Sequence, residues 1–323
     1  MKTIRNEKIL FTGLTGQIGF PLAVELAKNN EVWGIARFQD KARREETEKI
    51  GIVVHPATRE ELEKLEITTR VVDLANPDFR LLPDDFTYVI HFGVFQGGGL
   101  DFDHALRVNA EGTGLLMSHC RKARGFFVMS TCSIYDTPQD PYHAVKETDP
   151  LGGGRPAYTP TYAISKTAEE AVARFVARQL NLPTTIARMN TSYGPNGGLP
   201  AYQFDWILAG APVPTMARRR SVTTPIHQDD INAQIAGLLA AASVPATIVN
   251  WGGDDAVEEA TYCRYMAKIA GLKAEFQRTT DAVRHVVTDN TKRIELVGKC
   301  RVKWQDGMRQ MIAARHPELG LKA

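Results

Sequence analysis

The segment 12–19, with the sequence TGLTGQIG, constrains the fold of this chain more than any other feature. The apolar, β-prone run 9–12 leads into it, and an amphipathic helical pattern over residues 21–28 follows it. A glycine-rich turn between a strand and a helix is typical of dinucleotide-binding folds, in which N–H groups at the helix start face a pyrophosphate. The context therefore favours a dinucleotide site over a merely structural turn.

Each glycine of this loop has an expected task. Gly13 permits the tight turn, Gly16 lets the backbone approach the pyrophosphate, and Gly19 lets the helix pack closely on the strand. The predicted cofactor-binding residues of the loop are Gly13, Thr15, Gly16, Gln17, Ile18 and Gly19. Their spacing is Gly-x-x-Gly-x-x-Gly, a departure from the commoner Gly-x-Gly-x-x-Gly.

The first half of the chain alternates short apolar runs with longer amphipathic segments, the pattern of βαβ units around a parallel sheet. Strands are predicted at 9–12, 32–36, 69–72, 88–92 and 126–130, and helices at 21–28, 59–65 and 105–122. The continuous apolar character of the strands suits a sheet covered by helices on both faces. We therefore predict an α/β fold: a Rossmann-type doubly wound parallel sheet with a smaller C-terminal α/β substrate lobe.

The composition and hydrophobic pattern of the sequence change after Tyr135. Residues 136–160 are rich in proline and contain three successive glycines, so we expect a long, lid-like surface loop. Helices at 161–180, 229–242, 258–270 and 305–315 and strands at 184–188 and 247–251 are predicted beyond it. This pattern divides the chain into a dinucleotide-binding core, 1–188, and a mainly substrate-binding lobe, 189–323, parts of which return to the core.

Bulk properties narrow the classes of partner. A formal net charge of +2 over 323 residues gives no reason to expect nucleic acid or a membrane surface. The start of the chain has no signal-peptide pattern, and the four cysteines show no Cys-x-x-Cys pairing, so a reducing, cytoplasmic setting is expected. The scattered histidines lack the spacing of metal ligands. We expect a small-molecule substrate and no metal.

Cofactor choice is expected to depend on the end of the second strand. An acidic residue there would bind the ribose 2′-hydroxyl of NAD, whereas arginine accommodates the 2′-phosphate of NADP. The strand ends in Arg37, so NADP is favoured, with NAD as the alternative; Asp40 is the nearest carboxylate. Asp73 and Leu74 end the third strand, where Asp73 suits either the adenine edge or a helix N-cap.

Two segments suggest acid–base chemistry. Tyr162 and Lys166 stand four residues apart in a helical pattern and so share one helix face. A nearby ammonium favours the phenolate, which brings the pKa of tyrosine towards the working pH. The apolar strand 126–130 runs into the hydroxyl cluster 130–133, where polar groups collect in a parallel sheet. Alone, each segment has an ordinary structural explanation, a helix surface pair or a capped turn.

Taken together, the motifs resemble the extended (atypical) short-chain dehydrogenases/reductases, a group that includes the NAD-dependent epimerases and dehydratases of nucleotide sugars. The motifs that carry the resemblance are 12–19, 73–74, 91–93, 109–113, 130–135, 162–166, 188–195 and 226–230. They cover most of the chain in the expected order. They are specific for the family but not for a substrate.

The resemblance implies roles for individual residues. Tyr162 would be the general acid/base, and Lys166 would lower its pKa and hold the nicotinamide ribose. Thr131 falls at the substrate-orienting hydroxyl, with Ser130 as the near alternative. Asn109 would order the site behind the cofactor or position a helix.

The segment after the fourth strand would line the cofactor through Phe92 and Gly93, and Val94 replaces the usual small residue there. On the substrate side, Thr191 stands where nucleotide-sugar enzymes commonly carry asparagine, with Asn190 one residue early. Residues 223–225 replace Arg-Asp-Phe, which removes a guanidinium that would pair with a diphosphate. The run 218–220 of three arginines is a partial replacement or a solvated loop. The candidate substrate contacts are Val94, Ser133, Asn190, Thr191 and Arg219.

The leading hypothesis is a reductase or dehydrogenase that transfers hydride between NADP(H) and a carbonyl or secondary alcohol. The alternatives are a nucleotide-sugar epimerase or dehydratase, in which the hydride returns within one turnover, and a non-catalytic dinucleotide sensor. The resemblance also implies a homodimer built through helices 105–122 and 161–180.

Overall fold

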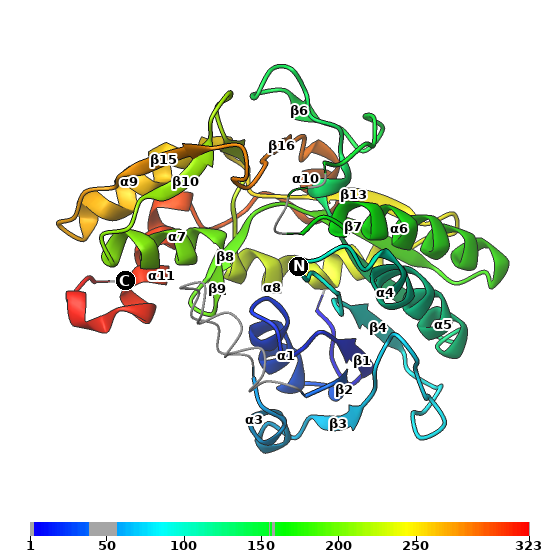
Figure 1. The fold of residues 1–323 in the computed structure, drawn as a ribbon. Helices are drawn as coiled ribbons and strands as arrows, with labels where there is room; N and C mark the ends of the chain where they lie inside the picture. The colour runs from blue at the N-terminus through cyan, green and yellow to red at the C-terminus, as the bar shows by residue number, and fades with distance from the viewer. Residues whose placement is uncertain (1–2, 39–56, 155, 157–158, 323) are drawn as a thin grey trace.

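The computed structural model describes residues 3–38, 57–154, 156 and 159–322. Within these ranges, seven parallel strands form one sheet in the order β13-β7-β5-β4-β1-β2-β3 (Figure 1). The strands are β1 (Lys8–Thr12), β2 (Glu31–Ala36), β3 (Thr68–Val71), β4 (Tyr88–His91), β5 (Gly125–Thr131), β7 (Thr184–Met189) and β13 (Thr247–Trp251). The order runs outwards from β1 in both directions, which is a doubly wound topology. The predicted Rossmann-type α/β fold is confirmed.

Helices cover both faces of this sheet. One face carries α1 (Gly19–Ala27), α8 (Gln228–Ala240) and α10 (Thr291–Val297), and the other carries α4 (Phe102–Leu106), α5 (Gly112–His119) and α6 (Tyr162–Gln179). Along β1, Ile9 and Phe11 belong to the first core and Leu10 to the second, because successive strand residues point to opposite faces. The short helix α3 (Arg59–Lys64) lies beside β3. This two-sided burial explains the continuous apolar runs.

A third apolar core lies between α7 (Leu199–Leu208), α9 (Glu259–Ile269) and α11 (Trp304–Arg315), at the left of Figure 1. Phe204, Tyr262 and Met308 are among its buried residues. Small sheets surround it. One has three strands, in the order β12 (Ile226–His227), β8 (Ser192–Gly194) and β9 (Gly197–Gly198). Two others each have two strands: β10 (Val213–Met216) with β15 (Phe276–Thr279), and β11 (Val222–Thr223) with β14 (Val257–Glu258). The chain ends in a turn of 3-10 helix, Pro317–Leu319.

Two predicted elements differ in the structure. The helix expected over 105–122 is divided, since a π-helical turn, Arg107–Glu111, separates α4 from α5, which ends at His119. The expected surface loop 136–160 is tied down in its middle, where β6 (Ala144–Val145) pairs with β16 (Val287–Thr288) and buries Val145. Both features involve contacts between residues far apart in the sequence. A local sequence pattern does not predict such contacts.

Several general features bear on the class of protein. Within the described part of the chain, every helix is too short or too polar to cross a membrane. The four cysteines, all in described segments, are free thiols. Among described residues, no group of three or more histidine, cysteine, aspartate and glutamate side chains is arranged to hold a metal ion.

A buried ion pair joins α6 to β7 of the sheet. Arg188 of β7 donates through Nε and Nη2 to the Glu170 carboxylate of α6, at 2.9 and 2.8 Å, and both side chains are almost fully buried. Ser130 of β5 donates to the same carboxylate at 2.6 Å, and Arg188 also donates to the Tyr135 hydroxyl at 2.9 Å. The pair therefore fixes α6 against β5 and β7.

Removing the cation of this pair should destabilise the fold strongly. We expect Arg188→Met to lower the free energy of unfolding by about 3–5 kcal/mol, because the Glu170 carboxylate would stay buried without its partner. The control, Lys28→Met, breaks an exposed pair with Glu25 and should change stability by less than about 1 kcal/mol. Equilibrium urea unfolding measures both, and equal losses would contradict the role of Arg188.

Candidate active site

The glycine-rich loop has the close approaches expected of it. Gly13 has a φ of +74°, and a Cβ there would come within 2.5 Å of the Phe92 carbonyl carbon. A Cβ on Gly19 would come within 2.2 Å of the Gly13 carbonyl oxygen, so α1 packs closely on the loop. At Gly16 the nearest atom to a Cβ would be the same oxygen, at 3.3 Å. The fold therefore requires glycine at positions 13 and 19 more strictly than at 16.

The start of α1 suits an anion. Ile18, which precedes the helix, provides no side-chain cap, and the first turn contains no acidic residue. The Phe20 N–H donates to the Gly16 carbonyl at 2.9 Å and Pro21 has no N–H, so within the first turn the helix can offer an anion the Gly19 N–H. Uncapped N–H groups at a helix start, together with the helix dipole, attract phosphate groups. The loop and the helix start therefore fit the pyrophosphate of a dinucleotide.

Two residues of the C-terminal half contact this loop, and sequence reasoning missed both. The Tyr202 hydroxyl of α7 donates to Oε1 of Gln17. Gln228, the first residue of α8, donates to the Ile18 carbonyl at 3.2 Å. Tyr202 lies outside the sequence motifs, and the motif 226–230 that contains Gln228 does not by itself indicate this contact. The C-terminal segments thus support the predicted cofactor loop directly.

The predicted adenosine side lies at the carboxyl ends of β2 and β3. Arg37 directly follows β2 and is exposed, whereas Asp40 lies outside the described residues. Asp73 accepts from the Ala75 N–H at 3.0 Å and caps a turn, so the helix N-cap alternative for it is wrong. Leu74 packs near Gly93, where a Cβ would come within 3.0 Å of its Cδ1. Leu74 and Gly93, predicted separately, are therefore brought together.

After β4, the ring of Phe92 points into the core against Phe11, with centroids 5.2 Å apart. Only the backbone of Phe92 borders Gly13. The next residues, Val94 and Phe95, are half-buried. In this segment the backbone of Phe92 and Gly93, and not the aromatic ring, therefore lies next to the glycine-rich loop.

Asn109 lies in the π-helical turn and connects two parts of the site. Its amide nitrogen donates to the Ser165 hydroxyl at 2.8 Å and to the Phe95 carbonyl at 2.9 Å. Its amide oxygen accepts from the Phe95 N–H at 2.7 Å. Asn109 therefore fixes the loop after β4 to α6, and π-helical turns of this kind are frequent at functional sites.

Tyr162 begins α6 beside the end of β5. The side chain of Thr131, the last residue of β5, lies close enough to the Tyr162 phenol to lower its pKa. Ser130, the alternative to Thr131, instead donates to Glu170 inside the fold. Ser133 lies close by, since its N–H donates to the Thr131 hydroxyl oxygen at 3.1 Å. The geometry thus pairs Thr131, and not Ser130, with the tyrosine.

Lys166 has different partners from those expected. Its ammonium donates to the Met129 carbonyl at 2.8 Å and forms a buried ion pair with Glu169. Burial raises the pKa of Tyr162 above its ordinary value; the nearby Thr131 side chain lowers it, and the Glu169 charge raises it further. The expected lowering of this pKa by Lys166 is therefore not present in this arrangement.

On the substrate side, Asn190 is almost fully buried and is used within the protein. Its amide oxygen accepts from the Thr223 hydroxyl at 2.6 Å, and its nitrogen donates to the Val286 carbonyl at 3.0 Å. Thr191 is half-buried, and its hydroxyl lies 2.6 Å from that of Thr223. Asn190 therefore joins three segments, which leaves Thr191 as the accessible member of this predicted pair.

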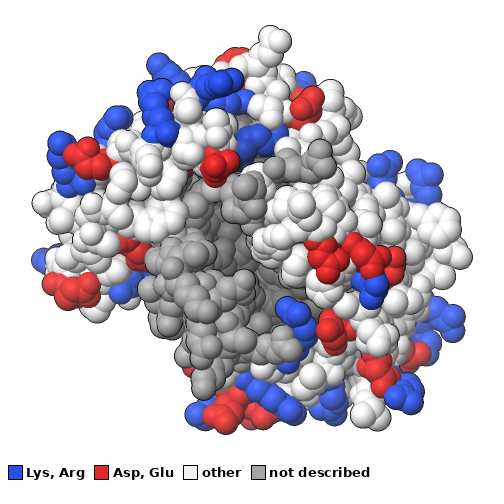
Figure 2. All heavy atoms as spheres, viewed as in Figure 1, with Lys and Arg blue, Asp and Glu red and all other residues white. Residues whose placement is uncertain are grey.

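Arginines gather around a pocket of about 490 Å³ beside β10 and β15. Its lining includes Arg218, Arg219, Arg220, Arg264 and Arg278, with Glu258 as an acidic member. Basic side chains are visible on the upper left of Figure 2, over this strand pair. Arg220 is paired with Glu258 at 2.6 Å. The positive charge left over suits an anionic ligand.

Two arginines hold the segment after β5. Arg219 donates to the Pro138 carbonyl at 3.1 Å. Arg284 donates to the Ser133 carbonyl at 2.8 Å and to the Tyr135 carbonyl at 2.9 Å. Sequence reasoning missed Arg284, because no local pattern surrounds it. The segment that follows Thr131 is thus connected to the arginine pocket.

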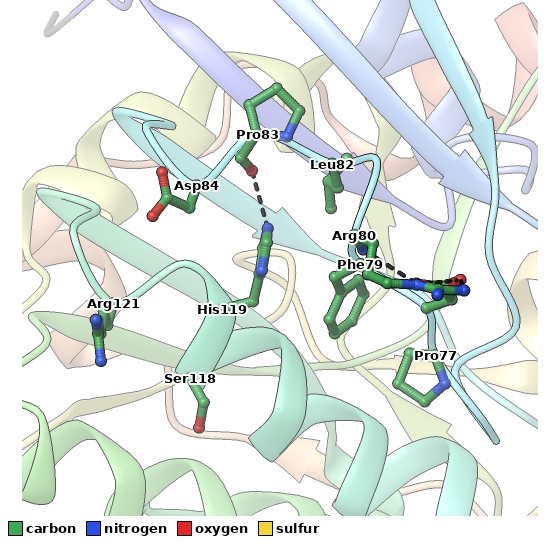
Figure 3. A pocket seen from close by; sticks show the side chains of 10 residues that line it. Pro77, Phe79, Arg80, Leu82, Pro83, Asp84, Ser118, His119 and Arg121 are labelled. Carbon is green, nitrogen blue, oxygen red and sulfur yellow. Dashed lines mark hydrogen bonds and ion pairs between the residues drawn. The ribbon is translucent and has the colours of Figure 1, made fainter.

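A larger pocket, of about 660 Å³, lies elsewhere (Figure 3). It is formed by residues 77–84, which precede β4, and by the end of α5, where His119 contacts the Pro83 carbonyl at 2.9 Å. These segments lead into the starts of β4 and β5, whereas Thr131 and Tyr162 lie at the other end of the sheet. Ligands of doubly wound sheets bind at the carboxyl ends of the strands. This pocket is therefore not the candidate site.

The sequence profile of the NAD dependent epimerase/dehydratase family matches residues 9–225. The matched region contains the glycine-rich loop, Thr131, Tyr162 and Lys166, and spans more than half of the chain. Among curated proteins, none matches the sequence.

Solved structures of similar fold include UDP-sugar epimerases. UDP-glucuronic acid 4-epimerase from Bacillus cereus, in complex with UDP-glucuronic acid and NAD, is 22% identical with a TM-score of 0.78, over 96% of this chain and 99% of that one. UDP-glucose 4-epimerase from Thermus thermophilus, in complex with NAD, is 22% identical with a TM-score of 0.75, over 95% and 98%. UDP-N-acetylglucosamine 4-epimerase from Methanobrevibacter ruminantium is 14% identical with a TM-score of 0.79, over 98% and 100%. These likenesses show the shared fold along nearly the whole chain.

Substitutions at two glycines should separate loop geometry from ligand approach. We expect Gly13→Ala to lower the free energy of unfolding by at least about 2 kcal/mol, because of its positive φ and the contact with Phe92. Gly16→Ala should cost less than about 1 kcal/mol but weaken NADH and NADPH binding at least about tenfold, because a methyl group would stand where the pyrophosphate approaches. Urea unfolding and fluorescence titration measure these effects. Unchanged dinucleotide affinity in Gly16→Ala would contradict the assignment of Gly16.

Proposed function

This chain belongs to the NAD dependent epimerase/dehydratase family, and we propose that it is an enzyme that transfers hydride between a nicotinamide dinucleotide and a secondary alcohol or carbonyl of its substrate. The observation that carries the proposal is the proximity of Thr131 and Tyr162 at the carboxyl end of β5, one helical turn from Lys166. A non-catalytic sensor would have no need of this arrangement.

The residues of the glycine-rich loop fit the cofactor. Gly13 and Gly19 allow the close turn, and the start of α1, which has no side-chain cap, offers the Gly19 N–H and the positive end of the helix dipole to the pyrophosphate. Arg37, exposed after β2, supports NADP over NAD because that strand ends without a carboxylate. The likeness to folds solved with NAD keeps NAD as the alternative.

In the proposed reaction, the dinucleotide supplies the hydride acceptor or donor. Tyr162 takes the proton of the substrate hydroxyl during oxidation and returns it during reduction. Thr131 binds the same oxygen and orients it towards Tyr162. Lys166, when close to the phenol, stabilises its deprotonated form and binds the ribose hydroxyls. Asn109 holds α6 and the loop after β4 in register for this chemistry.

We propose an anionic substrate for the pocket lined by arginines. Arg218, Arg219 and Arg278 are suited to phosphate oxygens, because guanidinium groups bind them in pairs of hydrogen bonds. The first two lie just before residues 223–225, which stand where the family carries Arg-Asp-Phe. Ser133, Val94 and Thr191 would contact the reacting part of the substrate. This charge favours the second candidate, a nucleotide-sugar epimerase or dehydratase, over a reductase of neutral carbonyl compounds.

We also propose the division into a dinucleotide-binding core, 1–188, and a substrate lobe, 189–323. The separate apolar core of α7, α9 and α11 supports it. A homodimer is proposed through α5 and α6. These helices expose Leu115 and Phe175, with 51% and 64% of their surface accessible, and apolar side chains of this size favour a protein partner.

The fate of the hydride distinguishes the two reactions. UDP-glucose, UDP-glucuronic acid and simple carbonyl compounds would be incubated with the enzyme and NADH, NADPH or their oxidised forms. An epimerase should convert a nucleotide sugar without net change in nicotinamide absorbance, and a reductase should change the absorbance steadily with a carbonyl compound. Dinucleotide binding without turnover of either class would contradict the proposed enzyme.

Loss of the Tyr162 hydroxyl should remove acid–base catalysis. We expect Tyr162→Phe to lower kcat at least about a hundredfold on the substrate identified by this screen, with dinucleotide affinity within about threefold. The control is Tyr265→Phe, because Tyr265 lies on α9 and its hydroxyl accepts from Arg309. Equal kcat values for the two variants would overturn the assignment of Tyr162.

A further inference from the structure

Adjacent glutamates on α6 have very different surroundings. Glu170 receives three hydrogen bonds, from Ser130 and from two nitrogens of Arg188. Glu169 is fully buried, and its charged partner is the Lys166 ammonium. The Thr113 hydroxyl reaches Oε1 of Glu169 only at 3.4 Å. The carboxylate next to the catalytic lysine is therefore poorly supplied with donors.

His91 does not neutralise this carboxylate. Its Nε2 lies 2.7 Å from the Thr113 hydroxyl, which itself donates to the Asn109 carbonyl at 2.6 Å. Nε2 therefore carries the proton, and Nδ1 accepts from Thr12 at 2.7 Å. Burial and the charge of Lys166 lower the pKa of His91 to about 3, so the ring is neutral. Its Nε2 stays 3.6 Å from Glu169.

Charged and neutral groups from four elements surround Glu169. Lys166 is the cation, Glu170 is a like charge on the same helix, and His91 of β4 is neutral. Thr113 of α5 is uncharged, and β5 contributes the Met129 carbonyl, which accepts from Lys166. Burial raises the pKa of Glu169 to about 7, although Lys166 lowers it. This carboxyl therefore changes its charge in the physiological range.

We propose that Glu169 is a positioning residue that holds the Lys166 ammonium away from the dinucleotide and releases it when the carboxyl binds a proton. The inference rests on the proposed function, in which Lys166 binds the ribose hydroxyls. With Glu169 ionised, the ammonium stays between this carboxylate and the Met129 carbonyl. With Glu169 neutral, the attraction is lost, and Lys166 is free to turn towards Tyr162 and the ribose.

The buried hydrogen bonds around His91 also extend to the glycine-rich loop. Thr12 accepts from the Gly93 N–H at 2.9 Å and bonds His91, and it directly precedes Gly13. Asn109, whose carbonyl accepts from Thr113, holds Ser165 next to Lys166. The polar groups around Lys166 are thus largely bonded to one another, so inside the protein its ammonium has few partners besides Glu169 and the Met129 carbonyl. Its position depends on the charge of Glu169.

The pH dependence of dinucleotide affinity tests this proposal. NADH and NADPH would be titrated by fluorescence from about pH 6 to about pH 8.5, on either side of the Glu169 pKa of about 7. In the wild-type protein, Kd should rise by about fivefold or more over this range, because ionised Glu169 competes for Lys166. In Glu169→Gln, Kd should stay near its low-pH value throughout. The control Glu295→Gln, at an exposed position of α10, removes the same charge and should behave as the wild type.

A wild-type Kd that is independent of pH would overturn the proposal without any variant, and so would an unchanged pH dependence in folded Glu169→Gln. Thermal unfolding checks the folding of each variant. Infrared difference spectra of the wild type test the protonation of Glu169 without a ligand. The absorption band of a buried, protonated carboxyl group should appear as the pH falls through about 7. Failure to detect this acid would also overturn the proposal. Absence of NADH and NADPH binding at every pH, with the acid detected, would overturn the proposed function instead.

Discussion

The bidentate ion pair between Arg188 and Glu170 fixes the helix on which the proposed chemistry depends. It anchors α6 to β7, and Ser130 extends the anchor to β5. Tyr162 and Lys166 occupy the first turns of that helix, so their distance from Thr131 follows from this anchor. A buried pair of this kind is costly to desolvate and is stable only with good geometry and further hydrogen bonds, which Ser130 and the Tyr135 hydroxyl supply.

The neighbouring glutamate shows how one helix can combine a fixed and a responsive charge. Glu170 is saturated with donors and has a structural role, whereas Glu169 depends on Lys166. The two residues differ by one position, which turns their side chains by about 100° around the helix axis. One side chain therefore enters the Arg188 cluster, and the other faces the buried hydroxyls near His91. In the proposed enzyme, the first fixes geometry and the second regulates the availability of the catalytic lysine.

The substrate lobe illustrates where sequence reasoning reached its limit. The arginine run 218–220 was identified, but its association with Arg264 and Arg278 arises from the pairing of β10 with β15. Asn190 was a candidate substrate contact, yet its amide is bonded to Thr223 and Val286 from distant segments. Tyr202 and Arg284 lie outside the motifs, and the motif 226–230 that contains Gln228 does not indicate its contact with the glycine-rich loop. Contacts between residues far apart in the sequence depend on chain topology, which single-residue patterns do not encode.

The sequence by itself determined the Rossmann-type core, the glycine-rich loop and the pairing of Tyr162 with Lys166 on one helix face. These features depend on local spacing: hydrophobic period, glycine conformation and helical repeat. Only the tertiary structure decided that Thr131 rather than Ser130 meets Tyr162, and that Lys166 meets Glu169. The physical reason is burial. Once water is excluded, each polar group must find its partner among the groups that the fold brings to it, and those come from β4, β5 and β7 as well as from its own helix.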